Sequence, residues 1–274
     1  MSFESRSVFY SKQRIMALAL AILFTTATLI SILALAILPC LTKSTELPLL
    51  VLRVDDIQDF AFKGAQLFLL NYSVENKLPL SLAVITGQFG LDTEIVRATR
   101  SAIASGSEVT VHGWQHENLA ELSLIEQMRV LSEAKTRLKE VLNVSTTILT
   151  PPMFSFNNET LTAMKREGYT ILSTSSDLHD AGIVAGIINI PATVELSDFA
   201  NGTWAMKSKD LLNFELKRSV QTNGYAVLVT HPQEFIKNGV LDKETATAFI
   251  ALIQDLQKTY QLVTLETLGE LKYR

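Results

Sequence analysis

The sequence predicts an α/β protein built on a parallel sheet and preceded by one apolar helix. Short apolar runs alternate with longer amphipathic stretches from residue 49 to the last turns of the chain. Several of the short runs are apolar on both faces, as strands of buried parallel sheets are. Alternating strands and helices favour a sheet that is either doubly wound or closed into a barrel.

The expected strands and helices can be located from apolar runs, helical spacing and capping residues. Runs with strand character cover residues 49–54, 80–86, 108–111, 146–149, 170–173, 187–190, 225–230 and 262–265. Stretches with helical spacing cover residues 61–76, 92–105, 123–142, 157–167, 208–222 and 242–260. Asn157 and Asp242 are expected N-caps, and Gly106, Gly168 and Gly224 stand where helices should end.

Composition excludes several classes of protein. The 274 residues are 47% hydrophobic, and 24 Lys+Arg against 28 Asp+Glu give a formal charge of −4. A disordered chain is therefore excluded, and no basic excess is available to bind nucleic acid. The single cysteine, Cys40, excludes an internal disulfide framework and a thiolate zinc cluster.

Residues 15–38 form an uncharged apolar run of 24 residues. A helix of that length spans about 36 Å, more than the roughly 30 Å of a hydrocarbon core. Arg6, Lys12 and Arg14 precede the run, so the positive-inside rule predicts a cytosolic N-terminus. A cleaved signal peptide or a buried core helix are the alternatives, but the run is longer than a typical signal-peptide core.

This reading divides the chain into four parts. Residues 1–14 are a cytosolic segment, 15–38 a transmembrane helix, 39–47 a linker and 48–274 one extracellular domain at the cell membrane. Four Asn-x-Ser/Thr sequons in the domain would then be accessible for glycosylation. They begin at Asn71, Asn143, Asn158 and Asn201.

Polar residues gather where the predicted strands end. In a parallel sheet those carboxyl ends lie on one side, where the loops of α/β barrels build active sites. The residues in question are Asp55 and Asp56, His112 and His116, Thr150 to Pro152, and His231. Taken singly, an Asp pair after a strand is more often a turn or a helix cap, and a histidine before proline is more often a structural residue. A His-x-x-x-His pair is a surface helix pair as often as not.

Together these residues indicate a metal site. The spacing of four between His112 and His116 puts both imidazoles on one side of a helical turn, and an aspartate from a neighbouring strand can supply a third ligand. Positions left open would take water and substrate. With zinc, the pKa of a bound water falls from near 16 to about 7, which favours a hydrolytic reaction.

The same residues resemble the motifs of the polysaccharide deacetylase family, the group with the NodB homology domain. Its aspartate pair after the first strand is similar to Arg53-Val54-Asp55-Asp56, and its His-[Ser/Thr]-x-x-His motif to the segment from His112 to His116. Its last motif, an apolar strand ending in histidine, resembles Leu228 to His231. The match in order and strand position extends over residues 48–268.

The resemblance implies a distorted (β/α) barrel and a metal-dependent hydrolase that removes acetyl groups from N-acetylated or O-acetylated cell-surface glycans. It implies that Asp55 is the general base and His231 the general acid. Asp56, His112 and His116 would hold one divalent metal, for which we expect zinc. The loop at Pro152 and the backbone N–H of Met153 would stabilise the oxyanion.

The chain departs from the family pattern at several places. The third motif usually begins with an arginine that orients the base, whereas Thr150 stands there, and Met153 replaces the expected aromatic residue. We therefore expect Asp55 to lack a cationic partner. Asp177 is the only trace of the fourth motif, and Trp114, Thr150 and Asp177 are candidate substrate contacts.

Two alternatives to a glycan deacetylase stay open. One is a barrel that keeps the fold and the metal but only binds carbohydrate. The other is a hydrolase for a different non-peptide carbon–nitrogen bond, such as that of a cyclic imide or a formamide. The presence of both Asp55 and His231 argues against the first, and export argues against the second. The expected partners are an acetylated carbohydrate and, through residues 15–38, a membrane.

Overall fold

The computed structural model describes residues 24–26, 28, 46–177, 180–200 and 202–273. The chain divides into two units, Met1–Glu46 and Leu47–Arg274. The predicted membrane helix over 15–38 lies almost wholly outside the described residues, as does the segment 1–14. Across the described ranges, no helix combines the length and the apolar character needed to cross a membrane.

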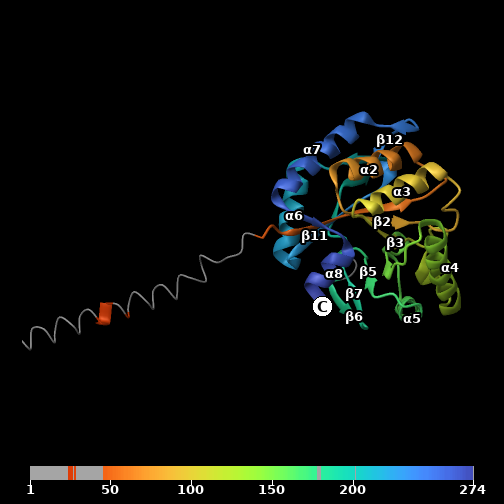
Figure 1. Cartoon of the computed structure of the whole chain (residues 1–274), viewed down its shortest axis with the longest axis horizontal. Coiled ribbons are helices and arrows are strands. Elements are labelled where there is room, and N and C mark those ends of the chain that lie inside the picture. Colours follow the sequence, from red (N-terminus) through yellow and green to blue (C-terminus); the bar gives the residue numbers. More distant parts are fainter. Residues whose placement is uncertain (1–23, 27, 29–45, 178–179, 201, 274) are drawn as a thin grey trace, which may run out of the picture. The chain divides into compact units, whose positions relative to one another are not determined.

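A curled sheet forms the centre of the second unit (Figure 1). Its strands run in the order β6-β7-β5-β4-β3-β2-β1-β11-β8, and β14 pairs with β1 as a branch. The pairs along this path are parallel except β6 with β7. The strands are β1 (Leu49–Ile57), β2 (Leu80–Val84), β3 (Glu108–Val111), β4 (Ile148–Leu149), β5 (Ile171–Leu172), β6 (Gly182–Val184), β7 (Ile187–Asn189), β8 (Val194–Glu195), β11 (Tyr225–Thr230) and β14 (Gln261–Val263).

Helices surround this sheet (Figure 1). They are α2 (Lys63–Asn76), α3 (Thr93–Ala104), α4 (Leu124–Leu142), α5 (Asn158–Arg166), α6 (Lys209–Asn223), α7 (Lys243–Thr259) and α8 (Leu265–Tyr273). The predicted caps are confirmed: Asn157 accepts the N–H of Thr160, and Asp242 accepts that of Glu244. Gly224 ends α6 at a φ of 76°, a left-handed conformation that glycine adopts without strain.

The α/β class and the parallel sheet are confirmed, and the prediction of a barrel is corrected in one respect. Within the described residues, the strand order runs from β6 to β8 without closing, so the sheet is a curled half-barrel. The strands predicted from long apolar runs are present, although β4 and β5 have only two residues each in the ladder. The run predicted as a strand over 262–265 ends at Val263, and α8 begins at Leu265.

Alternate side chains of β1 face two different hydrophobic clusters. Leu50, Leu52 and Val54 belong to the larger cluster, which lies between the sheet and the helices. Val51 belongs to the smaller cluster, together with Val229 of β11. Because side chains alternate along a strand, the odd-numbered residues of β1 share one face, which carries Arg53 and Asp55 towards the site.

Two short pairs of antiparallel strands were not predicted from the sequence. One is the hairpin of β9 (Ser197–Ala200) and β10 (Thr203–Met206), which pairs Trp204 with Phe199. The other joins β12 (Ile236–Lys237) to β13 (Val240–Leu241). Strands of two to four residues are too short to show a period of two in the sequence.

Candidate active site

A β-bulge at the end of β1 brings Asp55 and Asp56 to the same site. Val54 pairs with Leu82 of β2 and Ile57 pairs with Val84, so two residues of β1 stand opposite one of β2. Successive side chains of a regular strand point to opposite faces, whereas Asp56 has a φ of 59° that breaks the alternation. Both carboxylates are buried. The bulge therefore explains why both adjacent aspartates belong to one site.

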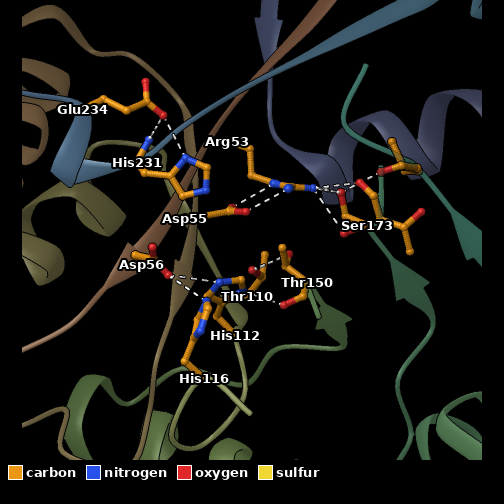
Figure 2. Close-up of polar contacts among 12 residues, drawn as sticks. Arg53, Asp55, Asp56, Thr110, His112, His116, Thr150, Ser173, His231 and Glu234 are labelled. Carbon is orange, nitrogen blue, oxygen red and sulfur yellow. Dashed lines mark hydrogen bonds and ion pairs between the residues drawn. The ribbon is translucent and has the colours of Figure 1, made fainter. Parts of the chain in front are cut away.

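Asp56, His112 and His116 converge (Figure 2). Oδ1 of Asp56 lies 3.2 Å from Nε2 of His112 and 3.3 Å from Nε2 of His116. One ligand atom from each residue lies within 4.8 Å of the other two. Burial opposes ionisation of Asp56, but the two imidazoles hold the pKa of its carboxyl below the ordinary range. The structure thus brings together all three predicted metal ligands.

Contacts outside this triad orient its ligand atoms. Nδ1 of His112 lies 2.7 Å from the carbonyl oxygen of Thr150. A carbonyl only accepts, so Nδ1–H donates, and this hydrogen bond turns Nε2 towards Asp56. Oδ2 of Asp56 accepts a 2.8 Å hydrogen bond from Nε2 of Gln233. Sequence reasoning missed Gln233, because a single glutamine after a proline has no recognisable pattern.

The triad fits a divalent metal ion. Oδ1 of Asp56 is buried and has no hydrogen-bond partner, although polar atoms in such positions are almost always paired. Two imidazoles and one carboxylate are the ligand types that zinc and similar ions take in hydrolases, with further positions left for water or substrate. A metal ion between the three ligand atoms would satisfy the unpaired oxygen.

The expectation that Asp55 lacks a cationic partner is wrong. Arg53 donates from Nε to Oδ1 and from Nη2 to Oδ2 of Asp55, both at 2.8 Å. The two residues are two apart on β1, so they share a face, and neither side chain is accessible to solvent beyond 2%. The arginine comes from the strand of Asp55 itself, and not from position 150 after β4.

Strand register places His231 beside Asp55. Val54 pairs with Thr230 of β11, so the next residues of the two parallel strands, Asp55 and His231, are neighbours. Nδ1 of His231 donates to Oε1 of Glu234 at 2.8 Å, which leaves Nε2 free for the site (Figure 2). Burial opposes protonation of His231, but Glu234 and the charge of Asp55 raise its pKa to about 9. His231 therefore carries a proton at neutral pH.

The predicted oxyanion loop is a short 3-10 turn, Pro152–Phe154. Pro152 is buried, whereas the Met153 side chain is 53% exposed. Met153 and Phe154 both have a φ of 54°, and Asp56 and His116 also have positive φ values. Such conformations strain non-glycine residues and are typical of functional sites. Around this site they set the directions of two candidate metal ligands and of the turn.

The side chains of the three predicted substrate contacts have different surroundings. Thr150 is fully buried, and its hydroxyl lies 2.9 Å from that of Thr110, so its side chain is not available to a bound substrate. The ring of Trp114 is partly buried and packs under the guanidinium of Arg137. Asp177 is exposed and lines a polar cavity of about 550 Å³ beside α6.

Comparison with known proteins agrees with this fold. Residues 43–172 match the family model described as polysaccharide deacetylase. A peptidoglycan deacetylase-like protein of Gibberella zeae is 23% identical over 140 residues, which are 51% of this chain and 40% of that protein. The match thus spans less than half of that relative.

Solved structures share the fold. A putative polysaccharide deacetylase from Mycobacterium smegmatis superposes with a TM-score of 0.64 at 18% identity, covering 84% of this chain and 92% of the other. A CE4 family pseudoenzyme from Bacillus anthracis gives a TM-score of 0.55 at 14% identity, with 81% and 65% covered. The fold and the triad define an α/β half-barrel with a candidate metal site at its strand ends. Over residues 43–172, just under half of its length, the chain is similar to the polysaccharide deacetylase family.

Proposed function

We propose that this chain is a metal-dependent hydrolase that removes acetyl groups from N-acetylated or O-acetylated cell-surface glycans. The observation that carries the proposal is the placement of Asp55 and His231 next to the metal-ligand triad, each held by a buried ionic partner. Arg53 holds Asp55 and Glu234 holds His231. A base and an acid held in this way serve proton transfer, which a protein that only binds sugar does not need.

We assign the metal to Oδ1 of Asp56, Nε2 of His112 and Nε2 of His116, and we favour zinc. When bound there, a divalent ion supplies a Lewis acid that polarises the acetyl carbonyl and makes water more acidic. The chain's own groups would do the rest. Gln233 and the carbonyl of Thr150 keep the ligand atoms of Asp56 and His112 in place.

Proton transfer is assigned to the two residues that the metal does not need. Asp55 takes a proton from the attacking water while Arg53 holds both of its carboxylate oxygens. The N–H of Met153 donates to the oxygen that becomes negative. His231 then gives its Nε2 proton to the departing amine or hydroxyl group. Acetate and the deacetylated sugar are the products.

A carbohydrate substrate is supported by aromatic side chains beside His231. The ring of Trp204 stacks on the His231 imidazole at 5.8 Å and 26°, and Phe199 lies 4.9 Å from Trp204. Phe199 is 61% exposed. Exposed aromatic side chains offer a large apolar contact area, and we assign this pair to the C–H face of a sugar ring. The names of the relatives also point to glycans.

The test is acetate release from a panel of N-acetylated and O-acetylated oligosaccharides, with and without a chelator. We expect release that the chelator abolishes and added zinc restores. Asp55→Asn keeps the size of the side chain but removes the basic oxygen, so turnover should fall by about 10² to 10⁴. Equal turnover by Asp55→Asn would contradict the assigned mechanism. Sugar binding without release by the unmodified chain would favour the binding-only alternative.

A further inference from the structure

We propose that Arg53 is a positioning residue that fixes Asp55 and links it to the turn carrying Met153. This inference rests on the proposed function, because it concerns how the base of that reaction is held. It assigns a role to the largest fully buried side chain of the described residues. Three sets of contacts carry it: those to Asp55, those to the end of β5, and that to Phe154.

The guanidinium of Arg53 binds both carboxylate oxygens of Asp55 and the two residues that follow β5. Nε and Nη2 each donate to one carboxylate oxygen of Asp55. Nη1 lies 2.8 Å from Oγ of Ser173 and also donates to the carbonyl oxygens of Ser173 and Thr174. The planar fork of a guanidinium therefore sets both the position and the plane of the carboxylate.

The loop beyond β4 contributes the remaining contact. The ring of Phe154 lies over the guanidinium, with its centroid 5.3 Å from the central carbon of Arg53. Phe154 directly follows Met153, and both residues are in the left-handed conformation. The edge of the Arg53 guanidinium thus contacts the base, Asp55, and the face of the guanidinium contacts the proposed oxyanion turn. Its rigid plane keeps these two parts of the site in one fixed relation.

Stability alone does not account for this arrangement. The rest of β1 before the aspartates is apolar, and Arg53 lies on the face that carries Val51 and its hydrophobic cluster. Removing an ion pair from water carries a desolvation penalty, and a packed apolar residue often stabilises such a position as well or better. The structure therefore points to a functional reason for a buried arginine here.

The first test separates geometry from charge in the full chain. Arg53→Lys keeps the positive charge but loses the planar fork. We expect kcat for acetate release to fall about 10²-fold, since small displacements of a catalytic group have effects of that size. KM and metal content should stay unchanged. Arg129→Lys is the matched control, because Arg129 forms an exposed ion pair with Glu133.

The second test asks whether Arg53 acts through Asp55. In the Asp55→Asn background, Arg53→Met should lower the remaining turnover much less than it does in the unmodified chain, because the carboxylate that it positions is already absent and only its contact with the turn is left to lose. Thermal unfolding gives a second measurement that needs neither metal nor substrate. Asp55→Asn alone leaves a buried guanidinium unpaired and should lower Tm, whereas the double variant should recover part of that loss.

Two outcomes overturn the inference while leaving the proposed function intact. One is wild-type kcat in Arg53→Lys in an active chain. The other is an additive loss of turnover in the double variant, with no recovery of Tm. If the unmodified chain releases acetate from no substrate in the panel, the proposed function itself fails, and the inference fails with it.

Discussion

Asp55 and Asp56 are neighbours in the chain, yet they have different partners. Asp55 faces a guanidinium and lies beside His231, whereas Asp56 faces two imidazoles. The bulge in β1 causes this difference. In a regular strand the Asp56 side chain would point to the face opposite Asp55, and the bulge turns it away from that face. One strand end therefore supplies both a candidate base and a candidate metal ligand.

The metal site can be tested one ligand at a time. His112→Ala and His116→Ala each remove one of three protein ligands, so the purified chain should lose most of its bound zinc. Metal content measured by mass spectrometry checks this. His231→Ala is the control, because His231 bonds to Glu234 and not to the triad, and it should keep the metal. Unchanged metal content in both ligand variants would remove them from the site.

The alkaline limb of activity should report on His231. An acid must be protonated to act, and a pKa of about 9 keeps His231 protonated well above neutral pH. Glu234→Gln removes the negative charge that helps to raise this pKa. The alkaline loss of kcat/KM should therefore move to lower pH in that variant. Glu215→Gln, which changes a partner of Lys207, should leave the profile in place.

Single residues show where prediction from sequence works. His112, His116 and His231 stand directly at or just after strand ends, so their gathering followed from the order of strands alone. The role of Arg53 did not follow, because the cationic partner of Asp55 was sought at position 150, where Thr150 stands, and only the side-chain geometry shows the bond within β1. A bulge of one residue also leaves no periodic signal, so the different orientations of Asp55 and Asp56 are visible only in the structure.

At the scale of elements, long apolar runs were predicted well and short edge pieces were not. β1 and β11 are almost wholly buried, which produces continuous apolar sequence. The hairpin β9–β10 is short and half exposed, so its residues look like a loop. It nevertheless places Trp204 against His231. Part of the site is thus built by an element that lacks a sequence signature.

Glu108 joins the start of β3 to α8 at the end of the sheet opposite the site. Its Oε1 accepts from Oγ of Ser81 at 2.6 Å and from the N–H of Leu265 at 2.8 Å. Its Oε2 accepts from the N–H of Glu266 at 3.2 Å. The carboxyl group of Glu108 therefore caps the first turn of α8, which explains why the strand predicted over 262–265 gives way to a helix.

Glu108 should make stability depend on pH. Burial raises its pKa from 4.5 to about 7, so the folded chain holds this proton at pH values where the unfolded chain has lost it. The stabilising contribution of the group is therefore lost as pH rises from about 4.5 to about 7. Glu108→Gln should gain stability relative to the unmodified chain over that interval. Urea unfolding at pH 5 and pH 8 measures the difference.

Glu133→Gln is the control for this comparison, since Glu133 lies on the exposed surface of α4 and pairs with Arg129. Its stability relative to the unmodified chain should change little between the two pH values. A relative stability of Glu108→Gln that falls as pH rises would contradict the buried, proton-holding role of Glu108.

At the scale of the whole molecule, one edge of a parallel sheet assembles residues that are far apart in sequence. Register does much of this work: Val111 pairs with Leu149, so His112 adjoins Thr150, as Asp55 adjoins His231. The fold alone does not determine activity, since a pseudoenzyme shares it at 14% identity. The side chains at the strand ends, and not the half-barrel itself, therefore carry the proposed chemistry.

Membrane topology is a prediction that rests on the sequence. Residues 15–38 are long and apolar enough to span a bilayer, and Arg6, Lys12 and Arg14 precede them. An anchor with its N-terminus in the cytosol would hold the domain outside, where surface glycans are the accessible substrate. The charge asymmetry, rather than the apolar run itself, sets this orientation.

Protease added to intact cells that express the full chain should therefore digest the domain without disruption of the membrane. Replacing all three basic residues with glutamine removes the charge bias while the apolar run stays intact. In that variant, part of the population should insert in the opposite orientation and become protected. A domain that resists protease until the membrane is broken, in the unmodified chain, would show that the positive residues do not set the topology in the predicted way.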